Sequence, residues 1–99
     1  MKNLKEIRRV LQNEKPFLIQ KYGIKDIKIF GSFVRGEQNS KSDLDILIDL
    51  EKPVKMDLIG LIELENYLSD LINIKVEISI KENLKQRIGK HILREAIEV

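Results

Sequence analysis

Two aspartates separated by one residue, Asp43 and Asp45, have the types and the spacing to act together. Side chains two residues apart on a β-strand point to the same face, so these carboxylates project side by side. A Gly31-Ser32 pair precedes them, and ten residues, Phe33 to Ser42, lie between. Glycine lets the backbone approach a ligand closely, and serine offers a hydroxyl to a phosphate oxygen. Because Mg²⁺ prefers hard oxygen ligands, the set predicts a site for magnesium and a nucleoside triphosphate.

Glu77 is the candidate for a third carboxylate in such a site. Two magnesium ions roughly 4 Å apart bridge the attacking and leaving oxygens in nucleotidyl transfer, and an acid on a neighbouring strand would hold one of them on the nucleophile's side. Glu77 is the acid on the outward face of a predicted strand over 74–80. Outward strand positions are also commonly charged for solubility, and both interpretations stay open. Asp49 shares the face of Asp43 and Asp45 but, at roughly 3.3 Å per residue, lies too far along the strand to bind the same metal.

The pattern Gly-Ser, ten residues, Asp, one residue, Asp resembles the active-site signature of the polymerase-beta-type nucleotidyltransferase superfamily. In so short a chain the resemblance is to the minimal nucleotidyltransferases (MNT), antitoxins paired with HEPN ribonuclease toxins, and it covers residues 4–99. It implies an α/β (α+β) fold with a small mixed β-sheet backed by helices. It also implies transfer of AMP from ATP to a tyrosine hydroxyl of a cognate HEPN toxin. In that reaction Asp43 and Asp45 would bind both of two Mg²⁺ ions, Glu77 would bind one, and one of these carboxylates would help to deprotonate the tyrosine.

The glycine turn also matches this family. By resemblance, Gly31 and Ser32 bind the β/γ-phosphates, and Arg35 is the arginine of a Gly-Ser-x-x-Arg-Gly pattern. Its guanidinium would either contact phosphate or brace the loop through a carboxylate, and the sequence does not separate these roles. At the third acid the family typically has Val-Asp-Leu-Val, whereas residues 76–79 read Val-Glu-Ile-Ser, so glutamate replaces the usual aspartate at Glu77.

Other polar residues receive simpler interpretations. Ser42 either caps the turn before Asp43 or lies near the metal, and we favour the cap. The single histidine, His91, is assigned no catalytic role. Six basic residues on predicted helix surfaces are either solvated, the interpretation we favour, or dock an acidic partner: Arg8, Arg9, Lys85, Arg87, Lys90 and Arg94.

The composition excludes several classes of protein. With 18 basic and 16 acidic residues, the net charge of +2 does not by itself imply nucleic-acid binding. The chain has no cysteine, which excludes disulfides and thiolate metal ligands, and one histidine makes a zinc site improbable. No apolar run approaches the ~20 residues of a membrane span, and the charged start over residues 1–4 lacks a signal-peptide core. We expect one cytoplasmic domain over residues 1–99, with no membrane contact.

The expected elements follow from hydrophobic spacing and from turn residues. Apolar residues recur at helical spacing from Leu4 to Leu18. We expect Asn3 to cap the start of this helical region and Gly23 to end it. Pro16 lacks an N–H group, so we expect a kink or two helices there. The further expected elements are strand 27–30, short helix 33–37, polar loop 38–42, strand 44–50, a helix over 58–71 capped by Asp57, strand 74–80, and one or two closing helices marked by Leu84, Ile88, Ile92 and Ala96.

Two other functions compete with the transferase. A non-catalytic antitoxin would neutralise its partner by binding and occlusion, and the Glu77 substitution keeps this alternative open. A small-molecule nucleotidyltransferase would need to gain its acceptor pocket by oligomerising, because a chain of 99 residues has no room for a second domain.

Overall fold

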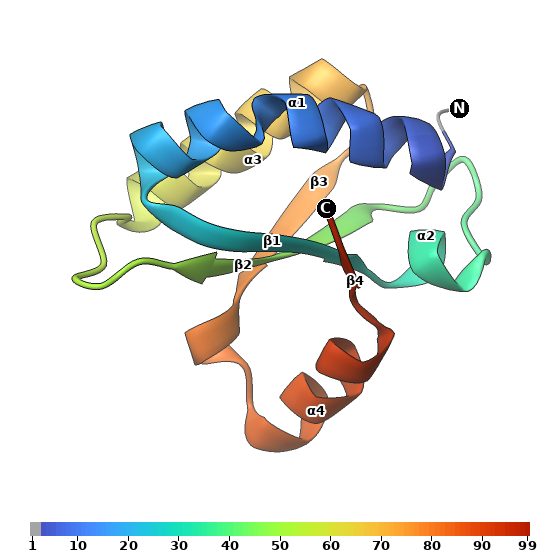
Figure 1. The fold of residues 1–99 in the computed structure, drawn as a ribbon. Coiled ribbons are helices and arrows are strands. Elements are labelled where there is room, and N and C mark those ends of the chain that lie inside the picture. The colour runs from blue at the N-terminus through green and yellow to red at the C-terminus, as the bar shows by residue number, and fades with distance from the viewer. Residues whose placement is uncertain (1–2) are drawn as a thin grey trace.

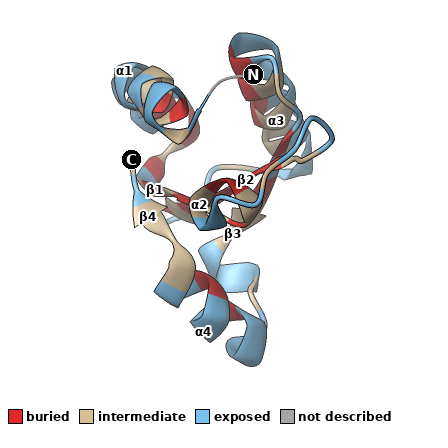
Figure 2. Cartoon of the chain, turned by 90° about the vertical axis from the view of Figure 1, so that its right-hand side faces the viewer, coloured by how far each residue is buried: buried red, intermediate tan, exposed pale blue. Residues whose placement is uncertain are grey.

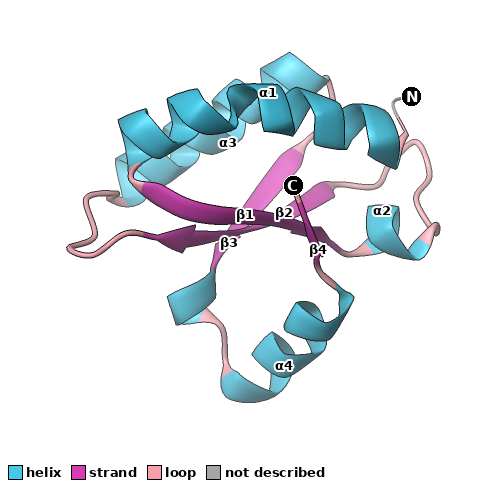
Figure 3. Ribbon diagram, viewed as in Figure 1, coloured by secondary structure: helices cyan, strands magenta, loops and turns pink. Residues whose placement is uncertain are grey.

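A four-stranded mixed sheet organises the chain. The computed structural model describes residues 3–99, so residues 1 and 2 of the charged start discussed above lie outside the described residues. The elements in chain order are α1 (Leu4–Tyr22), β1 (Ile24–Phe30), α2 (Ser32–Arg35), β2 (Leu44–Leu50), α3 (Leu58–Ile72), β3 (Val76–Ile80), the 3₁₀ turn η1 (Lys81–Asn83), α4 (Gln86–Glu95) and β4 (Ile97–Glu98). The strand order is β3-β2-β1-β4 (Figures 1 and 3). β2 pairs with β3 in parallel, and the other two pairings are antiparallel, which confirms the mixed sheet expected from the sequence.

Helix α1 is one helix from Leu4 to Tyr22 with Pro16 inside it, so of the two alternatives expected at Pro16, a kink or two helices, the second is wrong. The side chain of Asn3 accepts a hydrogen bond from the N–H of Glu6 at 2.9 Å, and Gly23 ends the helix in the left-handed region (φ 68°), as predicted. Pro16 lies on the exposed side of α1, and a proline inside a helix removes one backbone hydrogen bond. The buried Leu11 and Leu18 hold the helix on the sheet to either side of the proline.

The hydrophobic core lies between one face of the sheet and helices α1 and α3. Both helices run across that face (Figures 1 and 2), and their buried residues belong to the same hydrophobic cluster as the buried residues of the strands. Alternate residues of β2 supply the centre of the core: Leu44, Ile46, Ile48 and Leu50. The side chains between them therefore point away from α1 and α3, as the period of two predicts. Asp45 lies among these, so the predicted site is on the opposite face of the sheet.

Helix α4 lies on that opposite face (Figures 1 and 2). Leu47, which faces away from the main core, is only 3% exposed, and it lines a small gap together with Leu93 of α4. The buried Ile92 and Gly89 belong to the same helix, whereas Ile88, expected among the apolar markers of the closing helix, is 57% exposed. The predicted working face is therefore apolar in its middle, at Leu47, and carries carboxylates to either side, at Asp45 and Asp49.

The C-terminus differs from the expectation of closing helices alone. After α4 the chain becomes extended, and Ile97 and Glu98 pair with Ile29 and Lys28 of β1. A two-residue strand is too short to leave a period-2 pattern, so the sequence did not predict β4.

Two predicted strands also have different starts: β1 begins at Ile24 instead of 27, and β3 at Val76 instead of 74. Within residues 3–99, none of the helices has the length and apolar character needed to span a membrane.

Candidate active site

Strand β2 and its neighbour β3 bring the predicted carboxylates to one face. Asp43 directly precedes β2, and Asp45 is its second residue. In the parallel pairing of β2 with β3, Asp45 lies opposite Glu77, and neighbouring strands are about 4.8 Å apart. The N–H of Leu44 donates to the carbonyl of Lys75 at 2.8 Å, which fixes this register at the edge of the site. The structure thus brings together Asp43, Asp45 and Glu77 from two separate parts of the chain.

Gly31 ends β1 beside Asp45, and only glycine fits there. Phe30 is the register partner of Asp45, so the next residue turns away directly next to that carboxylate. Gly31 has φ +85° and ψ −155°, a combination that side chains strongly disfavour. A Cβ atom at this position would lie 2.2 Å from Oδ2 of Asp45. The turn and the carboxylate are therefore in direct contact, and an added methyl group would separate them.

Helix α2 follows Gly31 as a single turn, which confirms the short helix predicted here. The N–H groups of Val34 and Arg35 donate to the carbonyl of Gly31 at 3.0 and 3.1 Å, and Gly36 ends the turn in the left-handed region (φ 72°). Ser32 is the first residue of α2 and is half-buried. N–H groups at the start of a helix lack partners within the helix and favour anions. This end of β1 therefore presents a hydroxyl and polar backbone groups beside the carboxylates.

Arg35 makes the bracing contacts that were one of its two predicted roles. Its Nη1 donates to Oε1 of Glu95 at 2.7 Å, and its Nε donates to Oε1 of Glu37. Oε2 of Glu95 also accepts the backbone N–H of Gly31 at 2.8 Å. The hydrogen bonds that Arg35 donates to Glu95 and to Glu37 raise the pKa of the guanidinium. Glu95 could not be identified from the sequence, because nothing local distinguishes one acid at the end of a basic helix.

The carboxylates repel one another in the absence of a cation. Burial, followed by the charges of Glu77 and Asp43, raises the pKa of Asp45 from its ordinary 3.8 to about 6. The Arg35 guanidinium opposes this shift, and Glu95 adds to it. A half-buried carboxylate surrounded by acids on two strands is an environment that a divalent cation stabilises.

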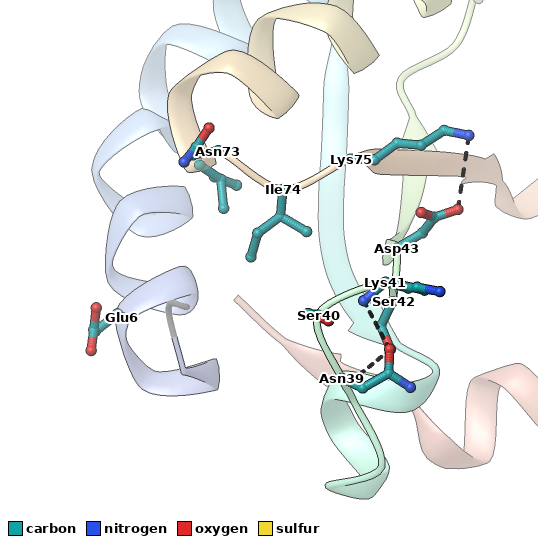
Figure 4. Close-up of a pocket in the computed structure, with 10 residues that line it drawn as sticks. Glu6, Asn39, Ser40, Lys41, Ser42, Asp43, Asn73, Ile74 and Lys75 are labelled. Atoms are coloured by element: carbon teal, nitrogen blue, oxygen red, sulfur yellow. Dashed lines mark hydrogen bonds and ion pairs between the residues drawn. The ribbon is translucent and has the colours of Figure 1, made fainter.

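The three carboxylates are suitable ligands for magnesium, but their oxygens do not converge on one position. Three carboxylates on adjacent strands supply the hard oxygens that Mg²⁺ prefers. Among the described residues, no three acidic or histidine side chains already stand as a common ligand cluster. Asp43 is turned towards Lys75, whose Nζ lies 4.0 Å from Oδ2 (Figure 4), and Glu77 is exposed. The three carboxylates would have to move closer together to share one ion.

A polar cavity of about 620 Å³ opens beside Asp43. Figure 4 shows it between the start of α1, the loop before β2 and the turn before β3. Its lining residues are Glu6, Asn39, Ser40, Lys41, Ser42, Asp43, Ile72, Asn73, Ile74 and Lys75. The start of α1 and the buried Ile72 of α3 belong to this lining, so the cavity extends to the side of the sheet that these helices cover. Asp43 borders the cavity, whereas Asp45, Glu77 and Gly31 are not among its lining residues.

Three further predicted residues have defined places. Oγ of Ser42 accepts the N–H of Asn39 at 2.9 Å, and the N–H of Ser42 donates to the carbonyl of Asn39 at 3.1 Å (Figure 4). Ser42 is thus the predicted turn cap. Asp49 lies 4.0 Å from Nζ of Lys81, away from the cluster. His91 is exposed on α4, and its charge contributes to the environment of Glu95.

Comparison of the sequence with known proteins agrees with this geometry. The nucleotidyltransferase domain family model matches residues 4–99. A Methanocaldococcus jannaschii protein named "Putative protein adenylyltransferase MJ1217" is 47% identical over 95 residues, which cover 96% of this chain and 95% of that protein. The protein adenylyltransferase MntA of Thermococcus cleftensis is 41% identical over 99 residues, which cover 100% of this chain and 98% of that protein.

Solved structures share the fold. A structure described as a "putative minimal nucleotidyltransferase" has a TM-score of 0.80 at 30% identity and covers 99% of this chain and 97% of its own. A complex described as tri-AMPylated Shewanella oneidensis HEPN toxin with MNT antitoxin matches with a TM-score of 0.66 at 16% identity, over 92% of this chain and 70% of that one. At 16% identity this second likeness concerns the fold alone.

Proposed function

We propose that this chain transfers AMP from ATP to a tyrosine hydroxyl of a HEPN ribonuclease toxin and so neutralises the toxin. The chain belongs to the nucleotidyltransferase domain family and is a protein adenylyltransferase of the minimal type. The observation that carries the proposal is the contact between the Gly31 turn and Asp45, beside Glu77 in the same register. The turn that we propose binds phosphate thus lies next to one of the three carboxylates that we propose bind magnesium. We further propose that residues 1–99 form one domain that acts in the cytoplasm, and that the partner protein supplies the acceptor.

Each site residue has a distinct role in this reaction. Gly31 and Ser32 bind the β/γ-phosphates, and Arg35 braces their turn. Asp43 and Asp45 would hold two magnesium ions and Glu77 one of them. When bound, magnesium neutralises the charge of the triphosphate and stabilises the leaving pyrophosphate.

The bond changes in the transfer step are simple. The tyrosine oxygen forms a bond to the α-phosphorus of ATP, and the bond from that phosphorus to pyrophosphate breaks. One of the carboxylates at Asp43, Asp45 and Glu77 accepts the hydroxyl proton, so no histidine is needed. The product is a phosphodiester on tyrosine that persists after the two proteins separate.

Two features of the similar proteins support a HEPN toxin as the acceptor of AMP. Full-length relatives carry the name protein adenylyltransferase, which describes AMP transfer to a protein. A complex with the same fold contains an AMPylated HEPN toxin beside its MNT antitoxin. The relation of both to this chain makes a HEPN protein the partner to test first, beginning with the reading frames next to its gene.

The test distinguishes covalent transfer from occlusion. The toxin is treated with a small fraction of an equivalent of this protein, with ATP and magnesium, and is then separated, repurified and assayed for ribonuclease activity. We expect lasting inactivation that requires both ATP and magnesium. Full recovery of ribonuclease activity after separation, together with neutralisation in proportion to the amount added, would reject the transferase and leave an antitoxin that acts by binding.

A further inference from the structure

We propose that Glu95 is a positioning residue for the transfer reaction, because its carboxylate holds both the phosphate turn at Gly31 and Arg35 in place against Asp45. This inference rests on the proposed function and adds to it a residue outside the metal and phosphate sets. Its two oxygens act separately: Oε2 accepts the backbone N–H of Gly31 at 2.8 Å, and Oε1 accepts Nη1 of Arg35 at 2.7 Å. One side chain from the C-terminal helix therefore links the start and the end of α2.

The environment of Glu95 differs from that of an ordinary surface ion pair. Its side chain is 13% exposed, whereas the other partner of Arg35, Glu37, is 61% exposed. Burial acts to raise the pKa of Glu95, yet hydrogen bonds from Arg35 and Gly31 and the charges of Arg35 and His91 together lower it. A hydrogen bond to a charged, shielded carboxylate is stronger and more directional than an exposed ion pair. Glu95 therefore constrains the turn, whereas Glu37 adds little.

The fold delivers Glu95 to this place through β4. Helix α4 ends at Glu95, and two residues later Ile97 pairs with Ile29, which lies two residues before Gly31. The short antiparallel pairing sets the end of α4 directly beside the end of β1. Glu95 is held from both sides, by its own helix and by the strand that follows. This placement explains why a strand of two residues matters at the C-terminus.

The contact has direct consequences for the reacting groups. The space between Gly31 and Asp45 is so tight that a Cβ atom would lie 2.2 Å from Oδ2. A turn that drifts without Glu95 changes the position of the triphosphate relative to the carboxylates. Displacements of about 1 Å in a reacting geometry cost about 10²-fold in rate. The loss should fall mainly on kcat, since a loosened turn still binds phosphate but holds it out of line.

The test uses Glu95→Ala, with Glu98→Gln as the matched control. Glu98 is also a carboxylate of this C-terminal segment, but it is 72% exposed, and it faces Lys28 at 4.0 Å. The first measurement is amide hydrogen exchange of Gly31 in the protein without nucleotide, which reports the contact independently of activity. We expect faster exchange in Glu95→Ala and unchanged exchange in Glu98→Gln. Unchanged exchange in Glu95→Ala would overturn the contact itself.

The second measurement is AMP transfer well below the melting temperature of each variant, with kcat and the KM for ATP determined separately. We expect kcat of Glu95→Ala to fall by about 10- to 100-fold, with KM within a few-fold of the wild type. Glu95→Gln keeps an acceptor for one of the two donors, so its kcat should lie between those of the wild type and Glu95→Ala. A merely structural role would lower the melting temperature and leave kcat of the folded protein equal to that of Glu98→Gln, which would overturn the proposal. Wild-type protein that transfers no AMP would instead reject the proposed function.

Discussion

Neutralising Asp45 should stabilise the protein in the absence of magnesium. Its pKa rises from 3.8 to about 6 in the folded protein, so the folded state binds this proton more tightly than the unfolded state. The stabilisation from the protonated carboxyl is complete below pH 3.8 and is lost as the pH rises through about 6. At pH 8 the charged Asp45 therefore destabilises the fold, and Asp45→Asn removes that charge without changing the volume of the side chain.

The size of the effect follows from the shift. Each pKa unit corresponds to about 1.4 kcal/mol, so a shift of about two units would give roughly 3 kcal/mol if no water reached the group. Asp45 is half-buried, and screening by solvent reduces the expected gain to about 1 kcal/mol. For a domain of this size, that gain raises the melting temperature by about 4–8 °C.

Thermal melts in EDTA at pH 4 and pH 8 measure this gain. We expect Asp45→Asn to melt above the wild type at pH 8 and close to it at pH 4. Asp49→Asn is the matched control: it removes the same charge from the same face of β2, but from a carboxylate 4.0 Å from Nζ of Lys81, so it should give no gain. A gain of equal size at both pH values, or none at pH 8, would refute the electrostatic reasoning.

Three other predictions concern the same site. Gly31→Ala should abolish transfer and destabilise the fold by about 1–3 kcal/mol, because its Cβ would meet Asp45 at 2.2 Å. The control is Gly36→Ala, because Gly36 also has a positive φ of +72° but no atom lies within 4 Å of the new Cβ. In denaturant melts this control should cost only about 1–2 kcal/mol, and it should keep transfer activity. Glu77→Ala should lower AMP transfer strongly while Glu77→Asp keeps substantial activity, both with near-normal melting temperatures because Glu77 is exposed; equal wild-type activity in the two variants would assign Glu77 to the solvated surface. Removing magnesium with EDTA should stop transfer without unfolding the protein. Mg-ATP should raise the melting temperature of the wild type but not of the double variant Asp43→Asn/Asp45→Asn. A transfer rate independent of magnesium would exclude a role for the metal.

The central part of the fold could be predicted from the sequence because its signals are local. Period-2 alternation over residues 44–50 predicted both the strand and the face that carries Asp45. The resemblance to the nucleotidyltransferase signature implied that the Gly31 turn and the carboxylates belong together. Asn3, Gly23 and Asp57 cap their helices as their residue types predict. For the strand and the caps, a few consecutive residues determine the structure.

Features that depend on tertiary contacts could not be predicted. Pro16 is compatible with one continuous helix because core packing to either side of it compensates for the lost hydrogen bond, and helix propensity alone does not include that packing. The pairing of Ile97 with Ile29 joins residues far apart in the chain and leaves no period to detect. Glu95 depends on that pairing, so its contacts with Gly31 and Arg35 were invisible in the sequence.

The intact mass of the toxin tests the central claim most directly. A HEPN toxin is incubated with ATP, magnesium and a catalytic amount of this protein, in parallel with the Asp43→Asn/Asp45→Asn variant, which keeps the fold because both side chains lie outside the hydrophobic core. We predict that the wild type adds the mass of one or more AMP groups to the toxin, that peptide mapping assigns them to tyrosine, and that the variant adds none. An unchanged toxin mass with the wild-type protein, or AMP added equally by the variant, would contradict the account.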